Sequence, residues 1–151
     1  TTHRIIAELI DLGVENTEIP TLLFDNSSFG RLQILGRALQ NMKVITEHKT
    51  AYITLTQDEL NSFGYVKGDT EGIVNYGLSI KGIVFAAIFI ENKEEKIIKI
   101  SFRSQGDFDV NQFARDYFNG GGHRNAAGGK SEVSMEETIR KFEDLVTKLS
   151  I

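Results

Sequence analysis

Nine consecutive apolar or small residues, GIVFAAIFI (82–90), limit the folds open to this chain. Such a run is either a β-strand covered on both faces or a buried helix. Its shortness and its β-branched and aromatic content favour the strand. A strand covered on both faces belongs to a sheet with helices on either side. The sequence therefore predicts an α/β fold.

Further strands are predicted before and after this run. Residues 43–47 and 50–56 have the pattern of a β-hairpin. A charged turn, ENKEE (91–95), leads into a strand that alternates between two faces, with Ile98, Ile100 and Phe102 on one and Lys99, Ser101 and Arg103 on the other. We expect a single domain with a central mixed β-sheet of about five strands flanked by helices.

Apolar spacing and capping residues predict the helices. The first covers residues 3–12. The second is N-capped by Ser28, with a buried stripe formed by Phe29, Leu32, Leu35, Leu39 and Met42. A helical turn is expected near residues 70–76. Capping pairs begin three more helices, at Thr56 with Glu59, Asp109 with Gln112, and Ser134 with Glu137. The helix after Asp109 should bury Val110, Phe113, Ala114 and Tyr117.

The distribution of charge restricts the class of ligand. The net charge is −4, which argues against a protein that coats nucleic acid in general. Residues 96–130 contain six Lys or Arg and three Asp, so this segment is +3 and the remainder is −7. A local basic site on an acidic body suits a small or short anionic ligand. The chain has no cysteine, which excludes disulfides and thiolate metal sites and fits a reducing, cytoplasmic location.

A triple glycine, Gly120-Gly121-Gly122, is followed directly by His123 and Arg124. Glycines let a ligand approach the main chain, and their N–H groups can bind phosphate. We expect a loop that binds an anion, continued by a helix-forming stretch at residues 125–127. The alternative is a flexible turn between two helices, and His123 taken alone could be structural.

Other residues are weaker candidates. Arg103 and Ser104 end a predicted strand, where α/β sheets commonly bind ligands, although Arg103 could equally be a surface residue. Glu71 and Asn75 could bind a ribose or a base edge, but a solvated turn is the better interpretation of their spacing. No metal site is expected, because the three histidines are not at ligand spacing.

With these motifs in view, the chain resembles the DHH-associated domain, which is the C-terminal half of DHH-family phosphoesterases. It is most similar to the enzymes that degrade very short RNAs and dephosphorylate 3′-phosphoadenosine 5′-phosphate (pAp), a group also described as exopolyphosphatase-related. The matching segments are DTEGIVNYGLSIKGIVFAAIFIE (69–91), KISFRS (99–104), DVNQFARDYF (109–118) and GGGHRNAAGG (120–129).

The resemblance implies a binding site for the substrate's phosphate and terminal nucleotide. Carried over position by position, that site comprises Arg103, Ser104, Gly120, Gly121, Gly122 and His123, with Arg124 as a less certain neighbour. In similar proteins the site faces an N-terminal lobe whose aspartates and consecutive Asp-His-His bind two manganese ions. This sequence contains no Asp-His-His. The catalytic centre is therefore expected outside this chain, and the chain alone is expected to be inactive.

The resemblance also implies a domain organisation and partners. Residues 1–42 are expected to form a helical connector from the missing catalytic lobe, and residues 43–151 the substrate-binding domain. The parent protein would be a manganese-dependent hydrolase acting on short oligoribonucleotides and on pAp, with mononucleotides as products and a homodimer as its assembly. Two alternatives stay open, namely a free-standing nucleotide- or nucleic-acid-binding module and an exopolyphosphatase-type domain. No apolar run approaches the ~20 residues that span a bilayer, so no membrane partner is expected.

Overall fold

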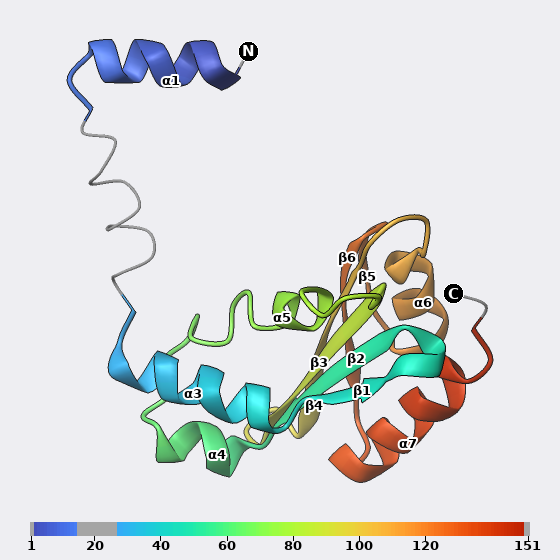
Figure 1. Ribbon diagram of the computed structural model, residues 1–151. Helices are drawn as coiled ribbons and strands as arrows, with labels where there is room; N and C mark the ends of the chain where they lie inside the picture. The colour runs from blue at the N-terminus through green and yellow to red at the C-terminus, as the bar shows by residue number, and fades with distance from the viewer. Residues whose placement is uncertain (1, 15–26, 150–151) are drawn as a thin grey trace.

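The computed structural model describes residues 2–14 and 27–149. Its centre is one six-stranded sheet in the order β1-β2-β3-β4-β6-β5, with helices against both faces (Figure 1). The predicted α/β class and mixed sheet are confirmed, with six strands where about five were expected. The strands are β1 (Lys43–Ile45), β2 (Thr50–Leu55), β3 (Phe85–Asn92), β4 (Ile97–Ser104), β5 (Gly121–His123) and β6 (Ala126–Ser131).

Strand pairing explains why the apolar run is continuous. β3 lies inside the sheet, parallel to β2 and antiparallel to β4, and all other pairs are antiparallel. A 3₁₀ turn, η1 (Thr46–His48), joins β1 to β2 in the predicted hairpin, and Lys49 closes it in the left-handed conformation at φ 45°. Every residue from Phe85 to Phe89 is buried, because helices cover β3 on both sides.

An aromatic core fills one face of the sheet. Here α6 (Val110–Tyr117) and α7 (Met135–Val146) pack against alternate residues of β3 and β4. The ring centroid of Phe142 on α7 lies 5.0 Å from that of Phe89 and 5.6 Å from that of Phe85. On α6, Phe113 is buried as predicted, but Tyr117 is 40% exposed, so the predicted inward position of Tyr117 is wrong.

An aliphatic core fills the opposite face, over β2 and β3. It is covered by α3 (Phe29–Gln40), α4 (Gln57–Ser62) and α5 (Asn75–Leu78). The helical turn expected near residues 70–76 is confirmed in part, because residues 71–74 form successive turns and α5 begins at Asn75. α5 approaches the sheet closely, because a Cβ on Gly77 would lie only 2.9 Å from that of Ala86.

The buried side of α3 differs from the prediction. Ile34 and Ala38 are fully buried, and Leu35 and Met42 are partly buried. Phe29, Leu32 and Leu39, three of the five residues expected in the buried stripe, are 76%, 53% and 44% exposed. The helix carries apolar residues on two sides, so spacing alone could not identify the side that packs on the sheet.

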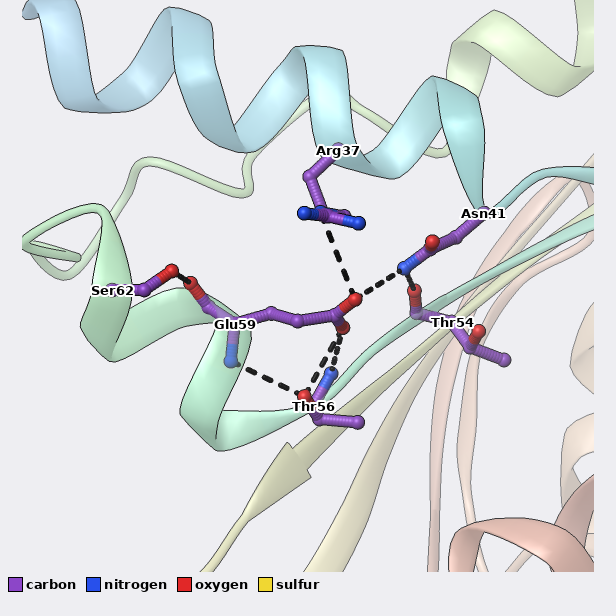
Figure 2. Close-up of polar contacts among 6 residues, drawn as sticks. All are labelled: Arg37, Asn41, Thr54, Thr56, Glu59 and Ser62. Carbon is purple, nitrogen blue, oxygen red and sulfur yellow. Dashed lines mark hydrogen bonds and ion pairs between the residues drawn. The ribbon is translucent and has the colours of Figure 1, made fainter.

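A polar cluster fastens α3 to α4 and β2 (Figure 2). The two helices begin with the expected caps. Ser28 caps α3, and Thr56 forms a capping box with Glu59 at the start of α4. The Glu59 carboxylate also accepts a hydrogen bond from Asn41 Nδ2 at 3.0 Å, and Arg37 Nε lies 3.8 Å from it. Asn41 donates as well to the main-chain oxygen of Thr54 in β2.

The first helix, α1 (Thr2–Asp11), lies apart from the sheet in Figure 1. Its apolar residues remain exposed, between 41% at Leu9 and 54% at Ile5. The predicted helix over residues 3–12 is confirmed. Among the residues described, no helix has the length and apolar character needed to cross a bilayer.

Candidate ligand-binding site

The glycine-rich segment is an edge strand, not a loop. Gly121–His123 form β5, which pairs antiparallel with β6, and Arg124 and Asn125 make the turn between them. The expected helical character of residues 125–127 is wrong, because Ala126 and Ala127 begin β6. β6 lies between β4 and β5 in the sheet. A small residue is needed at position 129, because a Cβ there would lie 2.9 Å from Phe118.

The register places two of the candidate residues, Arg103 and His123, in one row. Arg103 on β4 pairs with Ala126 on β6, which pairs with His123 on β5. Directly paired residues share a face of a sheet, so Arg103 and His123 flank Ala126 on the face opposite the aromatic core. The neighbouring row is Ser101, Gly128 and Gly121. Together the two rows form a surface of small residues bordered by a guanidinium and an imidazole.

Close packing explains two of the glycines. A Cβ on Gly120 would lie 1.9 Å from the main-chain oxygen of Gly128, and one on Gly122 would lie 2.5 Å from that of Ala126. A Cβ on Gly121 would make only ordinary contacts, the nearest at 3.6 Å. Packing therefore requires glycine at positions 120 and 122 but not at position 121.

Two of the three amides expected to bind an anion have partners inside the chain. Gly120 N donates to the main-chain oxygen of Ala114 at 3.1 Å, and Gly122 N donates to Asn111 Oδ1 at 2.8 Å. The picture of a loop with freely available N–H groups is therefore wrong. Any recognition of an anion here depends mainly on side chains.

Ser104 is buried beneath the turn that follows β4. The residue is 7% exposed, its hydroxyl donates to the main-chain oxygen of Phe108 at 2.7 Å, and the same hydroxyl accepts from Asn125 Nδ2 at 2.9 Å. Asn125 also donates to Gly106 O. These bonds join the tip of the β5–β6 hairpin to the turn at residues 105–108. Their geometry gives Ser104 a part in holding the hairpin.

The charged candidates differ in what they already bind. Arg103 is half-buried, and its Nη1 donates to the main-chain oxygen of Phe102. Arg124 is exposed and forms an ion pair with Asp107 at 3.0 Å. His123 is exposed at the end of β5. Arg103 and His123 thus lie in one row, and Arg124 extends from the adjoining turn.

The structure places Glu71 and Asn75 in other surroundings. Glu71 lines a pocket of about 340 Å³ together with Arg31, Leu32 and Tyr76, and the described lining of that pocket includes neither Arg103 nor the β5 residues. Asn75 is the exposed first residue of α5. Neither residue belongs to the row formed by Arg103 and His123.

Sequence reasoning missed three residues of this region, Asn111, Arg115 and Asn125. Asn111 and Arg115 are one helical turn apart on α6 and meet β5, and Asn125 ties the hairpin to Ser104. The i,i+4 spacing of Asn111 and Arg115 was visible in the sequence. That α6 would lie along β5 was not. Within the part of the chain that the structure describes, no three His, Asp or Glu residues gather as a metal site.

Comparisons with known proteins agree with this architecture. Residues 41–149 match the DHHA1 domain family. A crystal structure of an exopolyphosphatase-related protein from Bacteroides fragilis superimposes with a TM-score of 0.91 at 42% identity, over 97% of this chain and 43% of that one. A pGpG-specific phosphodiesterase from Vibrio cholerae shares the fold, with a TM-score of 0.57 at 15% identity over 98% of this chain and 50% of that one. The chain thus spans about half the length of these relatives or less, and it belongs to the DHHA1 domain family.

Proposed function

We propose that this chain is the substrate-binding domain of a DHH-family phosphoesterase that hydrolyses short oligoribonucleotides to mononucleotides and dephosphorylates pAp. The observation that carries the proposal is the row of Arg103, Ala126 and His123 across three strands. It combines two cationic or hydrogen-bonding side chains with a surface that carries almost no side-chain bulk. A phosphorylated nucleotide is a ligand that such a surface fits.

Each part of the row would contribute differently to binding. The planar guanidinium of Arg103 offers paired donors that match two oxygens of a phosphate. His123 would donate a hydrogen bond to the same group, more strongly when protonated. Ala126, Gly128 and Ser101 would let a sugar or a base lie close to the sheet. Ser104 and Asn125 would keep the hairpin tip, and hence His123, in position.

The chemistry of hydrolysis would come from outside this chain. The Bacteroides relative is more than twice as long as the matched region, which leaves room for a second lobe. We propose that residues 1–42 connect this domain to an N-terminal DHH lobe that binds manganese, that the full-length protein forms a homodimer, and that it works in the cytoplasm. The names of the two relatives, one specific for pGpG and one exopolyphosphatase-related, favour ligands joined through phosphates.

Binding of a 5′-phosphorylated diadenylate to Arg103→Ala tests the proposal. Loss of a charge-assisted contact should weaken binding by about 1–3 kcal/mol, measured by isothermal titration or by amide chemical shifts. Arg140→Ala is the matched control, since Arg140 is an exposed arginine on α7 paired with Glu136. Equal affinity of the wild type and Arg103→Ala, or shifts confined to residues away from β4, β5 and β6, would refute the proposed site.

Inorganic polyphosphate is the second candidate ligand, because the Bacteroides relative is described as exopolyphosphatase-related. A polyphosphate chain has phosphates but no base or sugar to lie on Ala126 and Gly128. If the nucleotide assignment is right, the diadenylate should bind more tightly than a polyphosphate of equal charge. The reverse order would favour the exopolyphosphatase-type domain.

A further inference from the structure

The side-chain oxygen of Asn111 accepts hydrogen bonds from both β5 and Arg115. Its Oδ1 accepts hydrogen bonds from Gly122 N at 2.8 Å and from Arg115 Nε at 3.0 Å. The first bond covers a main-chain donor on the outer edge of β5, which would otherwise be unpaired. The second restrains the Arg115 side chain through its Nε. The two terminal Nη groups of Arg115 are not used in this contact.

The restrained arginine lies against Gly121. From the position that a Cβ on Gly121 would take, Arg115 Nε is 3.6 Å away and Arg115 Cγ is 3.8 Å away. Gly121 is also the glycine of the triplet that packing does not require. Arg115 itself is exposed on the surface of α6. A guanidinium from α6 therefore borders β5 along its outer edge, while Arg103 on β4 and His123 on β5 border the glycine and alanine surface.

The positive charge of Arg115 is not compensated by its hydrogen-bond acceptor, Asn111. Lys99, Arg124 and Lys130 in the same basic segment each have a carboxylate within 4.0 Å. Arg115 has no such ion pair among the residues that the structure describes, and Asn111 is a neutral acceptor. A neutral acceptor orients the guanidinium but does not cancel its field. Arg103, which donates to a main-chain oxygen, is in the same situation.

We propose that Arg115 is a second phosphate-binding arginine, which contacts the ligand at the outer edge of β5 and is held ready by Asn111 as a positioning residue. This inference rests on the proposed function, because it assigns Arg115 to the same phosphorylated ligand. The alternative is that Arg115 only fastens α6 to β5. The two roles differ in their dependence on salt, because only a contact with the ligand releases counterions on binding.

The first experiment measures binding of the 5′-phosphorylated diadenylate to Arg115→Gln over a series of salt concentrations. Affinity should fall about tenfold, as expected for loss of a hydrogen bond between charged groups. The slope of log affinity against log salt should fall by about 0.7, the value for one phosphate contact on a single strand. Arg140→Gln should leave both quantities unchanged. Wild-type affinity and slope in Arg115→Gln would overturn the inference.

Two substitutions of Asn111 provide a test that leaves Arg115 in place. Asn111→Asp keeps an acceptor for both N–H groups but pairs the guanidinium with a carboxylate, so it should lower affinity and slope about as much as Arg115→Gln. Asn111→Ala releases the arginine without cancelling its charge, so affinity should fall while the slope stays close to that of the wild type. If Asn111→Asp binds the diadenylate as the wild type does, Arg115 does not contact the ligand.

Arg103→Ala separates failure of this inference from failure of the proposed function. If Arg103→Ala weakens binding while Arg115→Gln and Asn111→Asp do not, the site is correct and Arg115 is only structural. If none of the three variants changes the affinity, the proposed site itself is wrong. Thermal unfolding of each variant excludes a loss of binding that merely reflects a loss of fold.

Discussion

The carboxylate of Glu59 links α4 to the end of β2 and to the C-terminal end of α3, and these contacts stabilise the fold. It accepts from the N–H and the hydroxyl of Thr56 and from Asn41, with Arg37 nearby. Partial burial opposes the charged form, but these hydrogen bonds and the charge of Arg37 outweigh it, so the pKa of Glu59 lies below its ordinary value. A carboxylate with a lowered pKa stabilises the fold above its unfolded-state pKa and loses that effect as the pH falls through the folded-state pKa.

Glu59→Gln should therefore destabilise the protein in a pH-dependent way. Glutamine preserves the capping geometry but not the charge, so we expect the free energy of unfolding to fall by about 1 kcal/mol at pH 7. The difference from the wild type should begin to shrink near the ordinary carboxyl pKa of 4.5 and disappear as the pH falls through the lower folded-state pKa. Urea unfolding at pH 7 and pH 3 measures it. A difference that is the same at both pH values would show that the charge of Glu59 is not what stabilises the junction.

Ser104 shows what a residue's position in the sequence can and cannot indicate. Its place at the end of a strand beside Arg103 was predicted, and the structure confirms it. Its hydrogen bond to Phe108 O is local, but the one from Asn125 comes from the tip of the β5–β6 hairpin, which is distant in the sequence. A role in binding the substrate stays a prediction for Ser104.

At the scale of elements, the glycine triplet at β5 contains two positions where packing requires glycine and one where it does not. Gly120 and Gly122 have main-chain neighbours at distances that no Cβ could occupy, whereas the atoms nearest to a Cβ on Gly121 are side-chain atoms of Asn111 and Arg115 at ordinary contact distances. The glycines were interpreted from the sequence as a means for a ligand to approach. Two of them instead allow the main chain around β5 to lie close to that of β6. A sequence pattern cannot distinguish this close approach of two strands from the approach of a ligand.

Alanine substitutions along the triplet should separate these cases. Gly120→Ala should lower the free energy of unfolding by about 1–3 kcal/mol, because its Cβ would collide with main-chain atoms of Gly128. Gly121→Ala should change it by no more than about 1 kcal/mol, because the added methyl group has ordinary contacts. Chemical denaturation of both variants gives the comparison. Equal destabilisation would contradict the close approach of Gly120 to the main chain of β6.

Helix α3 likewise shows that packing between elements decides what a sequence pattern leaves open. Its existence and its Ser28 cap followed from the sequence, and both are confirmed. The side that it buries did not follow, because Phe29, Leu32 and Leu39 are as apolar as Ile34 and Ala38. Close approach decides between them, since a Cβ on Gly30 would lie 2.4 Å from the main-chain oxygen of Phe63. Only one orientation of α3 brings Gly30 against the end of α4.

At the scale of the molecule, the sheet carries two cores and a surface of small residues. The aromatic core lies under α6 and α7, and the aliphatic core lies under α3, α4 and α5 (Figure 1). Beside the aliphatic core, the same face continues over β4, β6 and β5 as the row of Arg103, Ala126 and His123. α1 belongs to neither core.

Removal of residues 1–14 should therefore leave the domain folded. Because the large apolar residues of α1 and the adjoining Leu12 are 41–81% exposed, we expect the free energy of unfolding to change by no more than about 1 kcal/mol. Urea unfolding of the shortened chain measures it, with binding of the diadenylate as a check on the site. A loss of several kcal/mol would mean that α1 packs on the domain in solution.

The sequence by itself determined the class of fold, most of the strands, the helix caps and the family, because these depend on local periodicity, on capping residues and on motifs contiguous in the chain. The tertiary structure alone decided which side of α3 is buried, that the glycine segment is an edge strand, that Asn111 and Arg115 border it, and that Asn125 ties its hairpin to Ser104. Each of these depends on contacts between segments distant in sequence or on the close fit of main chains. A local pattern contains no information about either.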